Sequence, residues 1–192
     1  MSIPLILASA SPRRRQLLAA AGYEVIVDPS MIDEPLPLGP VEPADYAAEL
    51  AWRKAAAVAR RHERGLILAA DTVCAVDDLI LGKPDDRDDA ERMIRLQEGR
   101  RSDVLTALCL RRADRPEWVG AVETTVIDFR PLTDPERRDY LDSGLWSGKA
   151  GGYGIQDAGP FVRVVRGSWS NVVGLPMERL KALLRDYSSL IS

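Results

Sequence analysis

Apolar runs of strand length alternate with helical patterns along this chain. The runs lie at residues 4–8, 23–27, 66–70, 103–111, 118–129 and about 161–165, and the helical patterns at about 12–21, 43–63, 86–97 and 176–187. This alternation predicts an α/β fold in which helices flank a mixed sheet. Since 46% of the 192 residues are apolar, the chain can bury one core or the cores of two small lobes.

Three smaller patterns refine this expectation. The runs at 103–111 and 118–129 are close enough to form a hairpin, and residues 73–76 are a candidate extension of the run at 66–70. Thr133 and Glu136 form a capping-box pattern that predicts a short helix. Residues 29–43 contain many prolines and predict an irregular loop.

The first predicted helix carries three arginines in its first turn. Ser11 fits the N-cap and Pro12 fits the first helical position, so Arg13, Arg14 and Arg15 follow at once. The helix macrodipole is positive there, and each cation costs roughly 0.3–1 kcal/mol. An anion bound to the free N–H groups would offset that cost. The pattern therefore predicts a phosphate site, the alternative being that all three arginines point into water.

Composition excludes several function classes. The net charge of -3 argues against a general nucleic-acid binder. No apolar run approaches the length of a membrane span, and the chain starts with a strand rather than a signal-peptide pattern, so we expect a cytoplasmic protein. Cys74 and Cys109 lie in strand-like apolar runs, which indicates core thiols in a reducing compartment.

The scarcity of histidine limits the chemistry further. His62 is the one histidine, and its charged neighbours near a helix end predict a solvated side chain. A Ser-His-Asp triad is therefore not expected, and one histidine with two distant cysteines does not supply the usual ligands of zinc. Catalysis would use carboxylates, lysines and arginines, with room for a hard cation held by oxygen.

Two residues stand out as candidates by their positions. Asp71 directly follows the apolar run 66–70, and ligand sites in open α/β sheets gather at the carboxyl ends of strands. A carboxylate there suits a general base or a metal ligand, although a turn aspartate is the alternative. Lys54 falls within the apolar stripe of the second helix, where it either snorkels to solvent or reaches an anion in a cleft.

Three further segments carry weaker signals. Lys83 follows Gly82 and precedes Pro84, in a pattern unlike any known dinucleotide fingerprint. Glu34 lies in the proline-rich loop, either as a cation ligand or as an ordinary surface acid. Residues 149–156 are too rich in glycine for a regular element, and Gln156 could read the edge of a nucleobase there, or the segment is only a turn. Together these features predict a site for a nucleotide polyphosphate with a divalent cation.

The chain resembles the Maf family of nucleoside triphosphate pyrophosphatases over nearly its whole length. The resemblance is carried by seven ordered motifs: residues 7–14 (LASASPRR), 32–34 (IDE), 50–55 (LAWRKA), 70–73 (ADTV), 81–84 (LGKP), 149–156 (KAGGYGIQ) and 171–176 (NVVGLP). It implies a Maf/ITPase-like α/β fold with a mixed sheet flanked by helices. Residues 1–192 would form a single domain of two lobes around an active-site cleft. Thr72 and the segment that ends in Gln156 are similar to the dTTP/UTP pyrophosphatase subgroup.

The resemblance also implies an activity and a set of site residues. The expected reaction is hydrolysis of dTTP or UTP to the monophosphate and pyrophosphate, with Mg²⁺ or Mn²⁺ as cofactor. Asp71 would act on the attacking water, and the metal would touch Asp71 or Glu34. The expected substrate-binding residues are Ser9, Arg13, Arg14, Lys54, Lys83, Thr72 and Gln156. The sequence leaves open whether the protein forms a homodimer. It also leaves open a rival function, that of a nucleotide-binding regulator of cell division or the stress response that does not turn over its ligand.

The chain departs from the family pattern at three places. Ser102 stands where the family usually has histidine, and residues 97–99 (QEG) replace its usual Ser-Gly step. Residues 146–148 (WSG) precede Lys149 where acidic residues are common, close to the segment expected to read the base.

Overall fold

The computed structural model describes residues 3–77, 79–157 and 161–190. The strands are β1 (Leu5–Leu7), β2 (Val25–Val27), β3 (Leu66–Val76), β4 (Leu79–Leu81), β5 (Arg100–Arg112), β6 (Trp118–Phe129) and β7 (Val162–Arg166). The helices are α1 (Pro12–Ala20), α2 (Pro43–Ala59), α3 (Arg87–Gln97), α4 (Asp134–Asp142), α5 (Trp169–Val173) and α6 (Met177–Leu190), with a 3₁₀ turn η1 at Ala150–Gly152.

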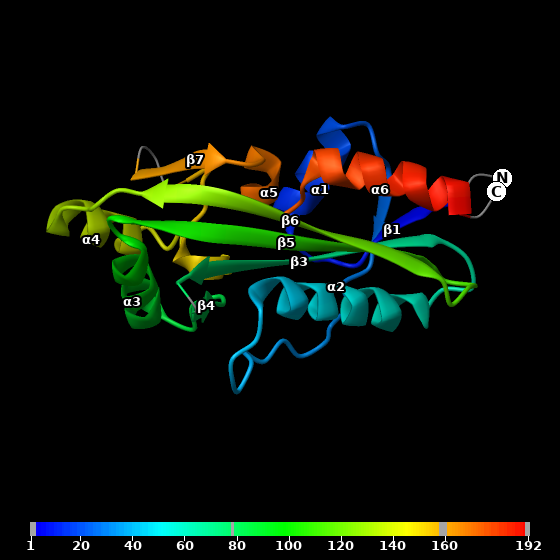
Figure 1. Cartoon of the computed structure of the whole chain (residues 1–192), viewed down its shortest axis with the longest axis horizontal. Coiled ribbons are helices and arrows are strands. Elements are labelled where there is room, and N and C mark those ends of the chain that lie inside the picture. Colours follow the sequence, from blue (N-terminus) through cyan, green and yellow to red (C-terminus); the bar gives the residue numbers. More distant parts are fainter. Residues whose placement is uncertain (1–2, 78, 158–160, 191–192) are drawn as a thin grey trace.

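The strands form one mixed sheet in the order β2-β1-β3-β5-β6-β7, with β4 paired to β3. β1 is parallel to β2 and β3, whereas β5 is antiparallel to β3 and β6. The long strands β5 and β6 run most of the length of the molecule (Figure 1). The α/β class, the mixed sheet and the hairpin of β5 and β6 predicted from the sequence are confirmed.

Helices cover both faces of the sheet at one end. α2 lies on one face, and α1 and α6 lie on the other (Figure 1). The side chains of β3 alternate between these two layers, since successive residues of a strand point to opposite faces. Ile67 and Ala69 pack with α2, whereas Leu68 and Ala70 pack with α1 and α6.

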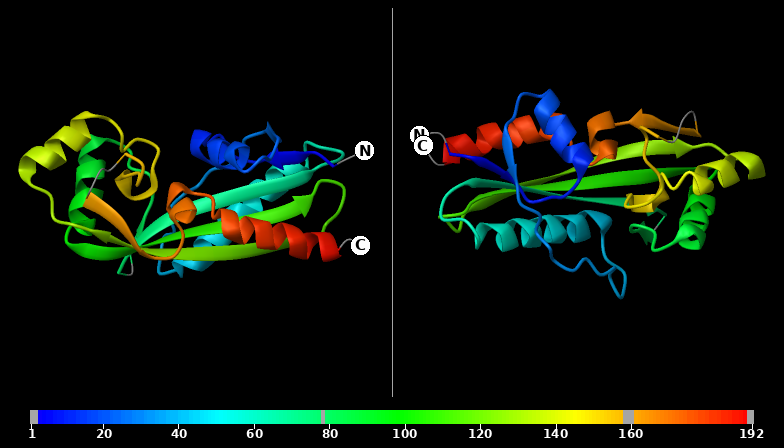
Figure 2. Two further views of the ribbon diagram at one scale, coloured as in Figure 1. Left: turned by 90° about the horizontal axis from the view of Figure 1, so that it is seen from above. Right: turned by 180° about the vertical axis from the view of Figure 1, so that it is seen from behind.

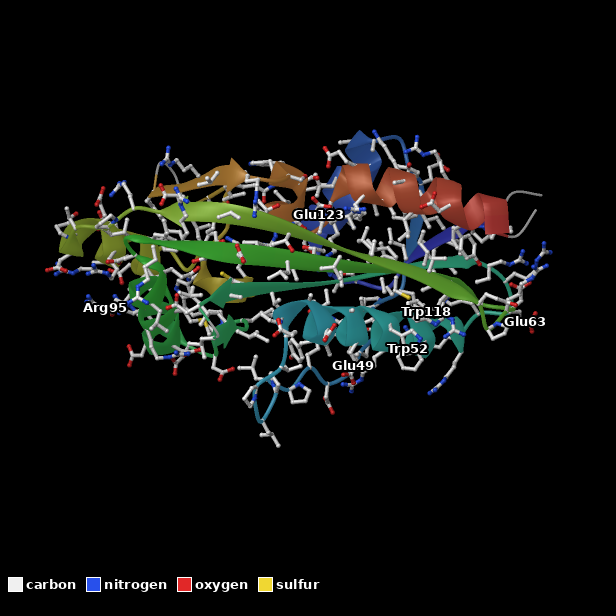
Figure 3. The ribbon with its side chains drawn as sticks, in the orientation of Figure 1. Glu49, Trp52, Glu63, Arg95, Trp118 and Glu123 are labelled. Atoms are coloured by element: carbon white, nitrogen blue, oxygen red, sulfur yellow. The ribbon has the colours of Figure 1, made fainter. Side chains whose placement is uncertain are left out.

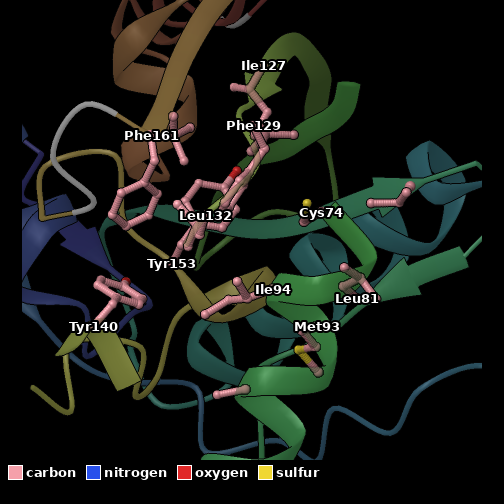
Figure 4. Close-up of a cluster of buried hydrophobic side chains, with 14 of the residues drawn as sticks. Cys74, Leu81, Met93, Ile94, Ile127, Phe129, Leu132, Tyr140, Tyr153 and Phe161 are labelled. Atoms are coloured by element: carbon pink, nitrogen blue, oxygen red, sulfur yellow. The ribbon is translucent and has the colours of Figure 1, made fainter. Parts of the chain in front are cut away.

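A second core fills the other end of the long strands, where α3, α4 and β7 gather (Figure 2). Its centre is aromatic: the Phe129 ring lies 5.5 Å from that of Phe161 and 5.6 Å from that of Tyr153 (Figure 4). Tyr153 ties the glycine-rich segment to this core. We propose that the two ends correspond to the two lobes expected from the sequence.

The edge of β3 is open between the two ends. β1 pairs with Leu66–Leu68, and β4 pairs with Cys74–Val76. Among the described residues, no strand pairs with that edge of β3 from Ala69 to Val73. A gap of this kind leaves room for a ligand to approach both faces of the sheet.

Several details differ from the expectations. Asp71 lies in the middle of β3, because β3 continues to Val76 through the run that was a candidate extension. α2 ends at Ala59, earlier than expected, and the short elements β4 and α5 were not predicted because so few residues show no periodicity. The residue types at positions 77–78, two successive aspartates, also predict a turn, and this pair lies partly outside the described residues.

Predictions from residues within one helical turn, and those for the cysteines, agree better with the structure. Ser11 caps α1 by accepting a hydrogen bond from the Arg14 N–H, and Thr133 and Glu136 form the predicted capping box of α4. Both cysteines are buried and free, as expected. The expectation for His62 holds in part: the side chain is 25% exposed, but its Nε2 lies 2.7 Å from Asp28 Oδ2. Within the described ranges, no helix is both long and apolar enough to span a bilayer.

Candidate active site

A cavity of about 730 Å³ opens at the gap in the edge of β3. This volume lies within the range of small-molecule sites. The cavity is lined from both sides of the sheet by the segment after β1, the loop at 29–34, Lys54 of α2, the middle of β3, Lys83, the glycine-rich segment and residues 172–174. All nine candidate residues are among the lining residues: Ser9, Arg13, Arg14, Glu34, Lys54, Asp71, Thr72, Lys83 and Gln156.

A row of alternating charges lies on the α2 side of the gap. Lys54 Nζ is 2.6 Å from Asp71 Oδ1 and 3.0 Å from Glu34 Oε1. Lys83 Nζ is 3.3 Å from Glu34 Oε2. Asp71 points to this side because it has the same parity on β3 as Ile67 and Ala69, which face α2. The side chains of Lys54 and Asp71 are only 6% and 7% exposed, so their pairing is needed to offset the loss of solvation.

Glu34 is the more accessible of the two carboxylates in this row, with a side chain 31% exposed against 7% for Asp71. Partial burial acts to raise its pKa, but attraction to Lys54, the hydrogen bond from Lys54 and the charge of Lys83 outweigh burial and lower the pKa below the ordinary value. Glu34 is therefore ionised at neutral pH and holds the two lysines in the cavity.

Glu34→Gln should lower the free energy of unfolding at neutral pH, because Lys54 and Lys83 lose a charged partner. A carboxylate with a lowered pKa contributes stability that is present above its ordinary pKa of 4.5 and is lost as pH falls through the folded value. The difference between wild type and Glu34→Gln should thus shrink below about pH 4.5 in urea unfolding curves. Glu49→Gln, on the outer face of α2 (Figure 3), is the control. An equal difference at pH 3 and pH 7 would contradict the assignment.

Arg14 organises the opposite side of the gap. Its side chain is buried, and its N–H groups donate to Gly174 O at 2.8 Å, Ser9 Oγ at 2.9 Å and Thr72 Oγ1 at 3.1 Å. Burial lowers the pKa of Arg14, and the carboxylates of Asp71 and Glu34 partly offset this effect. The guanidinium nevertheless stays charged at neutral pH. Arg14 therefore joins the segment after β1 to β3 and to the end of α5.

The three arginines of α1 do not behave alike. Arg13 is half-exposed, lines the cavity and lies within 3.5 Å of Gly148 O. Arg15 is exposed and does not line the cavity. The alternative that all three point into water is wrong, because Arg14 is buried and bonded to protein groups.

The glycine-rich segment forms one wall of the cavity and adjoins Lys83, since Gly151 N–H donates to Gly82 O at 2.9 Å. Gly151 has φ +70°, and a Cβ there would lie 3.1 Å from Cys74 Cβ, so only glycine fits this close turn. Lys149 is buried and pairs with Asp157 at 2.5 Å, which closes the segment on itself. Gln156 lines the cavity and is exposed, so its amide is accessible to a ligand.

Cys74 also lines the cavity, but it is not a nucleophile. Burial raises the pKa of its thiol to about 12, so the reactive thiolate is absent at neutral pH. Cys74 instead contributes to an apolar end of the cavity with Val104, Tyr153, Ile155 and Val172. Such a surface suits the face of a flat ring.

Two residues of the site were not found from the sequence. Thr106 on β5 is bonded to Thr72, and Gly174 supplies a carbonyl to Arg14. Gly174 has φ +114°, and a Cβ there would lie 3.4 Å from Thr72 Oγ1. Gly174 lay in a quoted motif without a role, and a threonine inside an apolar run such as that around Thr106 gives no signal by itself.

The chain is similar to several known proteins over most of its length. A dTTP/UTP pyrophosphatase from Rhodopirellula baltica is 48% identical over 185 residues, covering 95% of this chain and 82% of that protein. A dTTP/UTP pyrophosphatase from Ruminiclostridium cellulolyticum is 39% identical over 188 residues, covering 97% of both. The solved structure of a HAM1 protein from Coxiella burnetii matches 96% of this chain and 100% of that chain with a TM-score of 0.55 and 14% identity, a likeness of fold alone. The model of the Maf-like protein family matches residues 4–187, so the chain belongs to this family.

Proposed function

We propose that this protein hydrolyses dTTP and UTP to the monophosphate and pyrophosphate. The observation that carries the proposal is the row of Lys83, Glu34, Lys54 and Asp71 in a cavity whose other wall is the glycine-rich segment with Gln156. The two lysines can bind the negative charges of a triphosphate, and the apolar end of the cavity can hold the flat face of a nucleobase. The two relatives reported above are named as dTTP/UTP pyrophosphatases, which supports the choice of substrate.

Asp71 is the residue that we assign to the attacking water. Its Oδ1 accepts from Lys54, and no group among the described residues donates a hydrogen bond to its Oδ2. Oδ2 therefore remains able to orient a water molecule and take its proton while the water oxygen bonds to phosphorus. The bond between the first and second phosphates breaks, and pyrophosphate leaves.

The cations of the site would hold the phosphates and the charge that develops on them. Lys54 and Lys83 lie beside the carboxylates, and Arg13 reaches the cavity from the first turn of α1. Arg14 has already given three N–H groups to protein acceptors, so it has at most two left for substrate. Ser9, which accepts from Arg14, would contact the substrate beside it.

Asp71 and Glu34 would hold a divalent cation, Mg²⁺ or Mn²⁺. Both carboxylates lie at hydrogen-bond distance from the same Nζ atom, so their oxygens converge, and hard cations prefer such oxygens. In the described part of the chain no three His, Cys, Asp or Glu side chains form a metal cluster. Phosphate oxygens of the substrate would complete the set, as is usual for Mg²⁺. When bound, the cation offsets phosphate charge.

Thr72 and Gln156 are the residues that we assign to the base. Uracil and thymine present an edge with an acceptor, a donor and a second acceptor. The Gln156 amide can form hydrogen bonds with part of this edge. Main-chain groups of the glycine-rich segment would supply the remainder. A purine is larger, and the segment would have to move to admit it.

Gln156→Ala should narrow the preference for dTTP and UTP over ATP and GTP, which we expect to be roughly 1–3 kcal/mol or more in wild type. The change should come mainly from slower hydrolysis of the pyrimidine substrates, because the purines do not use the amide. Competition assays of kcat/KM measure it, with Gln16→Ala on the exposed face of α1 as control. Unchanged selectivity, or a wild type that prefers a purine nucleotide such as 7-methyl-GTP, would refute the assignment.

A nucleotide screen tests the function itself. The purified protein is incubated with individual nucleoside triphosphates and Mg²⁺ or Mn²⁺, and pyrophosphate release is measured. We expect release from dTTP and UTP. Binding without release would favour the rival class, a nucleotide-binding regulator. We further propose that the substrate is a free cytoplasmic nucleotide, in keeping with the buried free thiols and the net charge of -3.

A further inference from the structure

Two threonine hydroxyls form a hydrogen-bonded chain beside the cavity. Thr72 on β3 and Thr106 on β5 are register partners, and their Oγ1 atoms are 2.9 Å apart. Thr72 Oγ1 accepts from Arg14 at 3.1 Å. Thr106 is completely buried, and its Oγ1 lies 3.2 Å from the main-chain oxygen of Asn171.

The direction of this chain follows from counting protons, since each hydroxyl donates only one. If Thr106 donates to Asn171 O, then Thr72 donates to Thr106, and both protons are used within the protein. In the opposite direction the bond to Asn171 is lost, and no described residue accepts the Thr72 proton. The first arrangement makes one more hydrogen bond, in a buried place where an unmade bond is costly.

This direction limits what Thr72 offers to a ligand. Thr72 lines the cavity, yet its proton points toward Thr106, so its oxygen can only accept. Phosphate oxygens are themselves acceptors and gain nothing from such a group. A ring N–H can donate a hydrogen bond to this oxygen, and uracil and thymine carry such an N–H between their carbonyls. Cytosine has an unprotonated ring nitrogen at that position, which would face another acceptor.

We propose that Thr106 is a positioning residue: it keeps Thr72 as an acceptor and so makes the site favour uracil and thymine nucleotides over cytosine nucleotides. The inference rests on the proposed function, in that it deepens the choice of substrate at the same site. Thr106 touches no substrate and acts through Thr72 alone.

The test compares UTP with CTP. Values of kcat/KM are measured by pyrophosphate release for wild type, Thr106→Val, Thr106→Ser and Thr125→Val. Valine keeps the shape and removes the hydroxyl, whereas serine keeps the hydroxyl. Thr125 is the matched control: it is also completely buried, on β6, and its hydroxyl bonds to Ser168 and accepts from Asn171 Nδ2 without reaching Thr72.

In Thr106→Val the Thr72 proton is released, and we expect the UTP-to-CTP ratio to fall roughly tenfold, the size of one hydrogen bond. Thr106→Ser and Thr125→Val should keep the wild-type ratio, although Thr125→Val should lower the melting temperature about as much as Thr106→Val. An unchanged ratio in Thr106→Val, or an equal fall in Thr125→Val, would overturn the inference. If the valine variant does not fold, Thr106→Ala takes its place.

Calorimetry with UMP and CMP separates this inference from the proposed function. Wild type should bind UMP more tightly than CMP, and Thr106→Val should lose that difference. A wild type that releases no pyrophosphate from any triphosphate would refute the proposed function, while a UMP preference lost in Thr106→Val would still support the role of Thr106. Equal binding of UMP and CMP by wild type would overturn that role.

Discussion

Asp71→Asn is expected to bind dTTP and UTP but to release pyrophosphate at least ~10²–10⁴-fold more slowly than wild type, the loss typical of a missing general base. Asparagine keeps the size of the side chain and an oxygen for Lys54, which lies 2.6 Å from Asp71 Oδ1. It cannot take a proton from water. Turnover should therefore fall far more than affinity, which is measured as kcat by pyrophosphate release and as Kd by calorimetry.

Asp103→Asn is the matched control for this experiment. Asp103 also lies on a central strand, β5, but it is exposed and outside the cavity. Its substitution should leave kcat unchanged. If purified Asp71→Asn hydrolyses dTTP or UTP near the wild-type rate, Asp71 is not the base, and the proposed mechanism fails.

Lys54→Met is expected to abolish turnover and to lower the free energy of unfolding by about 3–5 kcal/mol. Lys54 lies between two carboxylates, and its removal leaves Asp71 and Glu34 close together without a shared cation. For a chain of this size such a loss lowers the melting temperature by roughly 6–20 °C. Thermal and urea unfolding at pH 7 measure the effect.

Lys83→Met provides the comparison. The Lys83 side chain is 59% exposed and pairs only with Glu34 among the described residues, so its removal should cost at most about 1 kcal/mol. The double variant Lys54→Met/Asp71→Asn should recover part of the stability, because one uncompensated charge is gone, without recovering turnover. Equal stability of Lys54→Met and Lys83→Met would contradict a buried charge row.

Local patterns in the sequence were sufficient for most elements. The start of α1 follows from the serine cap and proline, and the start of α4 follows from the capping box, since both depend on residues within one turn. The hairpin of β5 and β6 follows from two apolar runs with a short connection. β4 and α5 were missed because three or five residues show no period.

Asp71 lines the cavity, although the sequence placed it there for an incomplete reason. The sequence suggested the end of a strand, but Asp71 lies in the middle of β3. It is accessible because β1 stops at Leu7, opposite Leu68, and β4 ends at Leu81, opposite Cys74, which leaves the edge of β3 open beside it. The opening is therefore created by the ends of the neighbouring strands β1 and β4, and not by the end of β3 itself.

The sequence by itself determined the α/β class, the family and the chemical types in the site, because these depend on composition, local periodicity and ordered motifs. Only the tertiary structure decided how those residues are shared between the two faces of β3. Asp71 joins Lys54 on the α2 side, while Thr72 joins Arg14 and Thr106 on the other. The physical reason is that a strand turns successive side chains to opposite faces. The side chains that Asp71 and Thr72 meet on each face come from other elements, and contacts between residues far apart in the chain determine their positions.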